Sequence, residues 1–186
     1  MTERQQEPRC IPLDVGPGST LLSWNGTTPE SPDRTRLVYL KVEGPVGEQP
    51  RTMPGELWVC DSDLTGHSKV FDVPMTCAGF PHNGAMASWI DNRRVVFRQL
   101  APSGPKIYVL DVDSGEVCFP PIVGNLGHYA TQGKVPFGIY PAEVGRNPAY
   151  PGIDGEGLYQ LDTDAGTVER VIATEEIIAF AEAAGF

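Results

Sequence analysis

Apolar and polar residues alternate in three stretches of the chain that resemble one another. The stretches are "ELWVCDSDLTGHSKVF" from Glu56, "KIYVLDVDSGEVCFP" from Lys106 and "GLYQLDTDAGTVERVI" from Gly157. In each, the alternating run predicts a strand, an Asp-x-Asp cluster followed by glycine predicts a tight turn, and a second apolar run predicts a returning strand. Each stretch is therefore expected to form a β-hairpin. The aspartates are interpreted as turn residues and not as calcium ligands, because the other carboxylates of a calcium loop are missing.

Two further strands are expected before each hairpin. The segments that start at Leu21 and at Ala85 both contain Ser-Trp, a polar turn, and an arginine that precedes an apolar run. The equivalent part of the third copy, "HYATQGKVPFGIY", is looser. The aromatic residues Trp58, Tyr108 and Tyr159 stand 50 and 51 positions apart. Four strands in every ~50 residues are the signature of a β-propeller blade.

The sequence thus predicts an all-β chain that forms an incomplete propeller of about three blades, each with four antiparallel strands. Blade one covers about residues 20–75, blade two 80–123 and blade three 127–173, and a further element starts at 174 and ends at 186. A closed propeller needs ~4–8 blades, so three blades leave the ring open. We expect part of a larger propeller; two copies that together supply six blades, or an open arc, are the alternatives.

The charge of the chain excludes some classes of partner. The net charge is −10, whereas nucleic-acid binding needs a cationic surface, so neither nucleic acid nor an anionic membrane is expected. The first ten residues, "MTERQQEPRC", contain no apolar core of a signal peptide, and no apolar run is long enough to span a bilayer. The four cysteines stand far apart without a C-x-x-C pair. This pattern indicates free thiols and a cytoplasmic location, with no metal site.

Two histidines are candidates for chemistry at the funnel end of the propeller, where the loops between blades and between second and third strands lie. His82 and His128 are each expected to open the innermost strand of a blade. Either could act as a general acid or base, because the pKa of imidazole lies near neutrality. The alternative is that each imidazole bonds the backbone of a neighbouring blade and only stabilises the ring. His67 lies in a hairpin turn and is expected at the opposite end, in solvent.

Three further residues could bind a substrate at the funnel end. Arg98 ends a strand of blade two and could pair with a carboxylate of a ligand or with an acidic side chain of the protein. Arg146 and Tyr150 belong to a Pro/Gly-rich loop of blade three that is long enough to arch over the funnel. Trp24 and Trp89 occupy matching core positions, so both are interpreted as packing residues.

The hairpin motif, preceded by a strand such as "RLVYL" or "RVVFR", resembles the TolB-like family of propeller repeats. Within that group, the stretch "FPHNGAMASWIDNRRVVF" is most similar to the N-terminal part of oligogalacturonate-lyase-like propellers. The resemblance implies β-elimination of uronate oligosaccharides by a histidine base, with an arginine or a divalent metal such as manganese neutralising the carboxylate. The ligands of that metal would lie outside this chain.

Two functions follow as hypotheses. In the first, the chain is part of a carbon–oxygen lyase acting on oligouronides, with His82 and His128 as catalytic residues and Arg98, Arg146 and Tyr150 binding the substrate. In the second, the chain is a non-catalytic TolB-like module that binds a carbohydrate or protein partner at the funnel, because propeller folds serve many functions. A histidine and arginine cluster in further blades would distinguish the two.

Overall fold

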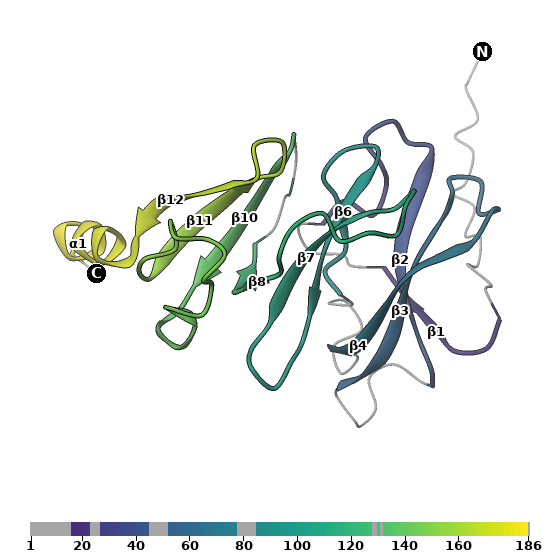
Figure 1. Ribbon diagram of the computed structural model, residues 1–186, viewed down its shortest axis with the longest axis horizontal. Helices are drawn as coiled ribbons and strands as arrows, with labels where there is room; N and C mark the ends of the chain where they lie inside the picture. The colour runs from purple at the N-terminus through teal and green to yellow at the C-terminus, as the bar shows by residue number, and fades with distance from the viewer. Residues whose placement is uncertain are drawn as a thin grey trace, which may run out of the picture.

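Three four-stranded antiparallel sheets follow one another along the chain and stand side by side (Figure 1). A computed structural model describes residues 16–22, 27–44, 52–77, 85–127, 130 and 132–185. In every sheet the strands pair in their sequence order, so each sheet is a meander. The prediction of an all-β chain with three propeller blades and an open ring is therefore confirmed.

The strands are short in the inner part of each blade and longer toward its centre. Blade one contains β1 (Ser19–Leu21), β2 (Arg36–Val42), β3 (Thr52–Asp61) and β4 (Ser68–Cys77). Blade two contains β5 (Ser88–Trp89), β6 (Arg94–Gln99), β7 (Lys106–Asp111) and β8 (Ile122–Val123). Blade three contains β9 (Asn125–Leu126), β10 (Lys134–Ile139), β11 (Gly157–Asp162) and β12 (Thr167–Ala173). A 3-10 helix, η1 (Pro141–Glu143), and a C-terminal helix, α1 (Thr174–Ala183), complete the chain.

Two strands start earlier than the pattern suggested. β3 starts at Thr52, four residues before the predicted hairpin stretch that begins at Glu56. β9 spans Asn125–Leu126 and so ends before position 128, where the innermost strand of blade three was expected to open. Both strands pair with a neighbour at these positions: Thr52 of β3 stands opposite Cys77 of β4, and Asn125 of β9 stands opposite Gly138 of β10. Pro54 lies at an irregularity in the register of β3, where a proline is tolerated.

The hydrophobic core lies between the blades. Alternate residues of a strand point to opposite faces of the sheet, so the middle blade buries both of its faces. On β6, Val95 and Phe97 pack with blade one, whereas Val96 packs with blade three. On β7, Ile107 and Val109 also pack with blade three. Each blade is thus stabilised by its neighbour, as expected for repeats that stack.

Trp89 closes the core between the first two blades. Its side chain is 1% exposed, and its indole N–H donates to the carbonyl of Pro29 at 2.9 Å. The Arg36 guanidinium lies over the ring, 5.0 Å from the ring centroid. Pro29 and Arg36 come from the first part of the chain, so the predicted packing role of Trp89 is confirmed as a contact between blades. Trp24 lies outside the described residues.

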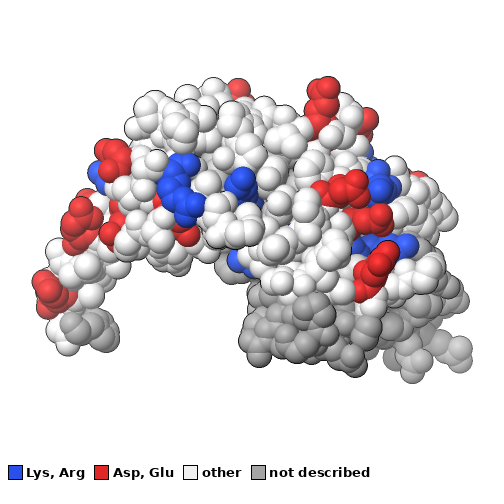
Figure 2. Space-filling view, turned by 60° about the horizontal axis from the view of Figure 1, so that its bottom comes forward, with Lys and Arg blue, Asp and Glu red and all other residues white. Residues whose placement is uncertain are grey.

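The three blades and α1 follow an arch that is hollow on one side (Figure 2). Charged side chains of both signs are scattered over the face shown there. α1 extends from the end of β12 beyond blade three (Figure 1), and none of its side chains is buried. Among the described residues, no helix is long and apolar enough to cross a membrane.

The repeated aspartates form the hairpin turns, as predicted. The Asp111 carboxylate accepts the backbone N–H groups of Asp113 at 3.0 Å and Ser114 at 3.1 Å. Asp162 accepts those of Asp164 and Ala165, both at 2.9 Å. Within the described ranges, no three His, Cys, Asp or Glu side chains are grouped to hold a metal ion.

The position of His67 in a hairpin turn predicted a side chain in solvent, and the structure corrects this prediction. His67 is half-buried on blade one, with Nδ1 3.1 Å from the Tyr39 hydroxyl and Nε2 2.9 Å from the Leu64 carbonyl. The turn folds the imidazole back over the sheet because Tyr39 offers a polar partner there.

Among the cysteines, Cys60 is a buried free thiol and Cys118 an exposed one.

Candidate functional site

At the hairpin end of the arch, every blade carries a cation at the same position, and two of these cations form ion pairs with the next blade. The second strand of every blade starts with a cation that stands opposite the first aspartate of the hairpin in the same blade. These cross-strand pairs are Arg36 with Asp61, Arg94 with Asp111, and Lys134 with Asp162. Because the register is the same in all three blades, the three cations are structural equivalents.

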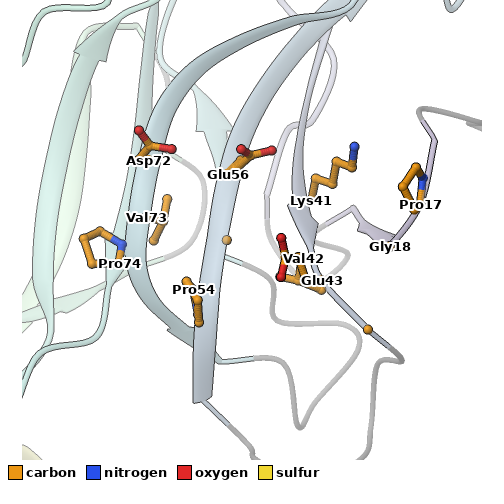
Figure 3. Close-up of a pocket in the computed structure, with 12 residues that line it drawn as sticks. Pro17, Gly18, Lys41, Val42, Glu43, Pro54, Glu56, Asp72, Val73 and Pro74 are labelled. Carbon is orange, nitrogen blue, oxygen red and sulfur yellow. The ribbon is translucent and has the colours of Figure 1, made fainter.

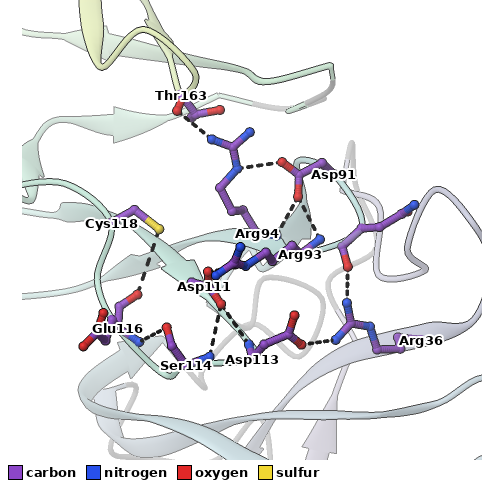
Figure 4. A network of polar contacts seen from close by, with 11 residues as sticks. Arg36, Asp91, Arg93, Arg94, Asp111, Asp113, Ser114, Glu116, Cys118 and Thr163 are labelled. Atoms are coloured by element: carbon purple, nitrogen blue, oxygen red, sulfur yellow. Dashed lines mark hydrogen bonds and ion pairs between the residues drawn. The ribbon is translucent and has the colours of Figure 1, made fainter.

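Two of these cations bind the hairpin of the next blade (Figure 4). Arg36 Nη1 lies 2.8 Å from Asp113 Oδ1 of blade two. Arg94 Nη2 lies 2.6 Å from Asp164 Oδ1 of blade three, and Arg94 Nη1 donates to the Thr163 carbonyl at 2.6 Å. The planar guanidinium can serve several acceptors at once, which suits an arginine for this position. In blades two and three, the second aspartate of the hairpin therefore binds the cation of the preceding blade.

The two ends of this series lack such a partner blade in the described part of the chain. Lys134 of blade three instead binds Asp162 of its own blade, and this hydrogen bond lowers the pKa of Asp162 to about 2. Asp63, the equivalent of Asp113 and Asp164, lies exposed in the first hairpin. Its carboxylate accepts the backbone N–H of Thr65 at 3.1 Å and the hydroxyl at 2.7 Å.

Arg94→Met is expected to reduce the free energy of unfolding by about 2–3 kcal/mol, the usual scale for losing charge-assisted hydrogen bonds at a partly buried site. The Arg94 side chain is 20% exposed and also binds Asp91 at 2.6 Å, so the substitution removes three contacts between and within blades. Arg94→Lys should lose most of the same stability, because an ammonium does not reproduce the fork of donors. Urea unfolding measures both changes.

Arg93→Met is the matched control. Arg93 is the neighbouring residue, 65% exposed, and binds Asp111. An ion pair with a largely exposed cation contributes about 0–1 kcal/mol, and without Arg93 the Asp111 carboxylate keeps the backbone N–H groups of Asp113 and Ser114. This variant should therefore unfold close to wild type. Equal losses for Arg93→Met and Arg94→Met would contradict the assignment of Arg94 as the link between blades two and three.

The opposite end of the arch carries the loops between second and third strands, and two predicted binding residues lie there. Arg98 is half-buried near the end of β6, and its backbone N–H donates to the Ala85 carbonyl at 2.6 Å. Arg146 lies exposed in the long loop of blade three, with its guanidinium beside the Gly104 turn of blade two. The structure thus places both arginines at the same end of neighbouring blades.

The long loop of blade three, residues 140–156, is fixed to blade two by its own side chains. Asn147 is buried; its Oδ1 accepts the Val123 N–H at 2.7 Å and its Nδ2 donates to the Val123 carbonyl at 2.9 Å. Tyr150 is buried, and its hydroxyl donates to the Pro120 carbonyl at 2.6 Å. Burial raises the pKa of Tyr150. Its hydroxyl is therefore engaged within the protein, and a substrate role for Tyr150 would act through the position of the loop.

A pocket of about 680 Å³ lies on the outer face of blade one, toward the loop end (Figure 3). Lys41, Glu56 and Asp72 lie in one row across β2, β3 and β4. Glu43 adds a third carboxylate, and the remaining walls come from apolar side chains and glycines, among them Val42, Val73, Pro54 and Pro74.

The row of charges is held in place by neighbouring side chains. The Trp58 indole N–H donates to Glu56 Oε2 at 3.0 Å, and the Lys41 ammonium lies 5.2 Å from the centroid of the Trp58 ring. Lys69 lies 3.1 Å from Asp72 and 3.4 Å from Glu56, and the Asp72 hydrogen bond raises the pKa of Lys69. Counting Lys69, carboxylates outnumber ammonium groups by three to two. The pocket is polar, weakly anionic and floored by apolar groups.

Sequence reasoning did not single out this pocket. Apart from Glu43, its charged residues belong to strands, where the polar positions of an alternating pattern resemble a solvated face. The available signal was the position of Lys41, Glu56 and Asp72 at one level of three adjacent strands, which becomes visible only when the register is known. The predicted catalytic residues His82 and His128 lie outside the described residues and stay predictions.

No family model matches the sequence, and no curated protein matches it. Solved structures with a similar arrangement include a mutant of puromycin hydrolase complexed with PGG, at 14% identity over 77% of this chain and 21% of that one, with a TM-score of 0.47. TolB from Acinetobacter baumannii is 18% identical over 84% of this chain and 33% of its own length, with a TM-score of 0.47. The β-propeller domain of the Trilobed protease from Pyrococcus furiosus is 15% identical over 76% and 41%, with a TM-score of 0.44. The chain spans less than half the length of each.

The three four-stranded sheets and the cores between them define the class of the protein, which is a β-propeller arc. The similar structures include TolB proteins. At these identities the likeness concerns the fold alone, so activity and partners are matters of proposal.

Proposed function

We propose that this chain is a non-catalytic propeller module that binds a basic segment of a protein partner in the pocket of blade one. The observation that supports this proposal most strongly is the composition of that pocket. Glu43, Glu56 and Asp72 offer acceptors to a cationic head group, while the exposed rings of Pro54 and Pro74 suit the methylene stem behind it. A lysine or arginine side chain combines both parts.

The charge of the whole chain agrees with a basic partner. A net charge of −10 attracts cations over a distance set by the ionic strength. The same field repels polyuronates, whose carboxylates would meet three carboxylates in the pocket. The proposal therefore predicts that binding weakens as salt is added, because the attraction is electrostatic.

Titration calorimetry with tetralysine and with tetragalacturonate tests the proposal. Tetralysine should bind and tetragalacturonate should not. Glu43→Gln combined with Asp72→Asn should weaken tetralysine binding about tenfold, which corresponds to a loss of about 1.4 kcal/mol. The matched control is Asp154→Asn with Glu169→Gln, which removes two exposed carboxylates from blade three. The proposal fails if the control weakens binding equally, or if only tetragalacturonate binds.

A second candidate function is β-elimination of uronate oligosaccharides. The observation that favours it is the placement of Arg98 and Arg146 at the loop end of neighbouring blades, because guanidinium groups bind carboxylates through paired hydrogen bonds. In this candidate His82 would be the base and His128 the acid. A divalent metal, if one takes part, would be held by residues outside this chain.

A further inference from the structure

We propose that a second copy of this chain packs its blade three against blade one, so that two chains form a six-bladed ring. In each of the two contacts Lys134 of one copy would bind Asp63 of the other. This inference goes beyond the proposed pocket and does not need the pocket to bind a basic segment. It is argued from three repeated features of the blades.

The first feature is the series of ion pairs at the hairpin end. Arg36 reaches the second aspartate of blade two, and Arg94 reaches that of blade three, at 2.8 and 2.6 Å. Lys134 is the equivalent cation of blade three, and Asp63 is the equivalent aspartate of blade one. Their charges are opposite and their register positions are those of a bonded pair. A second copy would therefore supply to each end the group that every internal junction already contains.

The second feature is an apolar position that is buried in two blades and exposed in the third. The third strand of every blade carries an apolar residue opposite the fifth residue of the second strand. This residue is Leu57 in blade one, Ile107 in blade two and Leu158 in blade three. Leu57 is 0% and Ile107 2% exposed, because the next blade covers each of them, whereas Leu158 is 50% exposed. Val171 on the neighbouring strand is 62% exposed. The outer face of blade three thus keeps the side chains of an internal junction without a covering blade.

The third feature is an aromatic pair that faces the preceding blade. Phe97 and Tyr108 stack at 5.2 Å toward blade one, and Phe137 and Tyr159 stack at 5.7 Å toward blade two. Blade one repeats the pair with Tyr39 and Trp58 at 6.4 Å on its outer face. Tyr39 is buried and hydrogen-bonded to His67, so side chains of blade one fill the centre of this face. The pocket lies toward the loop end of the face, and Asp63 lies at its hairpin end. A partner blade would cover the pocket and turn it into a cleft between blades.

A second copy fits these two faces because one chain carries both halves of the junction. Packing the end of one arc against the start of another, twice, closes under two-fold symmetry. Two chains of three blades supply six, within the ~4–8 blades of closed propellers. An isologous contact of blade three with blade three would instead bring Lys134 against Lys134.

Charge reversal with complementation tests this arrangement. The wild-type chain of 20.1 kDa should sediment as a closed dimer at micromolar concentrations. Lys134→Glu and Asp63→Lys should each raise the dimer dissociation constant at least about tenfold, because like charges then meet at both junctions. Mixing the two variants should restore the dimer, since each junction of the mixed pair regains one cation and one carboxylate. Native mass spectrometry with one isotope-labelled variant identifies the mixed species.

Each variant also loses contacts within its own chain, such as the bond between Lys134 and Asp162. These losses persist in the mixture, so they cannot explain a restored dimer. Circular dichroism confirms that each variant is folded. Lys106→Glu and Glu116→Lys reverse one cation and one carboxylate of blade two and should leave the dimer unchanged, separately and mixed. The proposal is overturned if the wild type is still a monomer at about 100 μM, well above the micromolar range in which the dimer is expected. It is equally overturned by polymers that grow beyond the dimer or by single variants that do not complement each other.

Discussion

Trp89→Ala is expected to lower the free energy of unfolding by about 3–5 kcal/mol, the range for removing a large aromatic side chain from a packed core. The side chain is 1% exposed and lies between blade one and blade two. The substitution also leaves the Pro29 carbonyl without the indole donor and removes the ring beneath the Arg36 guanidinium. Domains of this kind have a total stability of about 5–15 kcal/mol. Trp89→Ala should therefore remove a large part of it, as measured by urea unfolding.

Tyr140→Ala is the control for loss of an aromatic ring without loss of a junction. Tyr140 is 60% exposed at the start of the long loop, so its replacement should change the unfolding free energy by about 0.5 kcal/mol or less. A second observable separates the junction from general destabilisation. If blade two were stable without blade one, Trp89→Ala would show two unfolding transitions with different urea midpoints. A single transition, shifted together for all probes, is expected. An unfolding curve like that of wild type would contradict the assigned role of Trp89.

His82→Ala is expected to lower the rate of uronate β-elimination by about 10²–10⁴, the usual contribution of a general base, if the second candidate function holds. The proton to be removed lies next to a carboxylate and is weakly acidic, so elimination needs a positioned base and a cation that stabilises the developing charge. Arg98 and Arg146 are two cations that the structure places at the loop end of neighbouring blades. The rate is measured on the full-length protein, as the ultraviolet absorbance of the unsaturated product.

His67→Ala provides the matched histidine control for this experiment. His67 lies at the hairpin end of blade one, where it binds Tyr39 and the Leu64 carbonyl. Its loss should leave the elimination rate of the folded protein unchanged, although the variant should be less stable than wild type. Full activity of His82→Ala, or no product from any uronate oligomer with the wild type, would remove the lyase candidate and leave the binding module.

Most of the fold could be predicted from the sequence because strand periodicity and hairpin chemistry are local. The alternation around Trp58 and Tyr159 marked two hairpins with their returning strands, and the aspartates marked the turns. In blade two the stretch that ends at Pro120 forms only an isolated bridge between Leu110 and Val117, and the returning strand β8 begins later, at Ile122. The innermost strands could not be placed as well. They are two or three residues long, so their sequences contain too few alternating positions to mark where pairing begins.

The candidate pocket could not be predicted because it depends on which residues share a level across strands. Lys41 and Asp72 are far apart in sequence and become neighbours of Glu56 only through the registers of β2 and β4 against β3. The ion pairs between blades were hidden for the same reason. Arg94 and Asp164 were each recognisable as members of a repeated motif, but the bond joins one copy of the motif to the next.

The amide of Asn147 has a consequence for how this protein avoids aggregation. An exposed strand edge offers unpaired N–H and C=O groups to any other extended chain, which can add to the sheet there. At β8 the Asn147 side chain occupies both the N–H and the C=O of Val123, as the backbone of a foreign strand would. β8 is only two residues long, so one side chain is enough to occupy much of this edge. The β8 edge therefore cannot offer the backbone groups of Val123 to a strand of another chain.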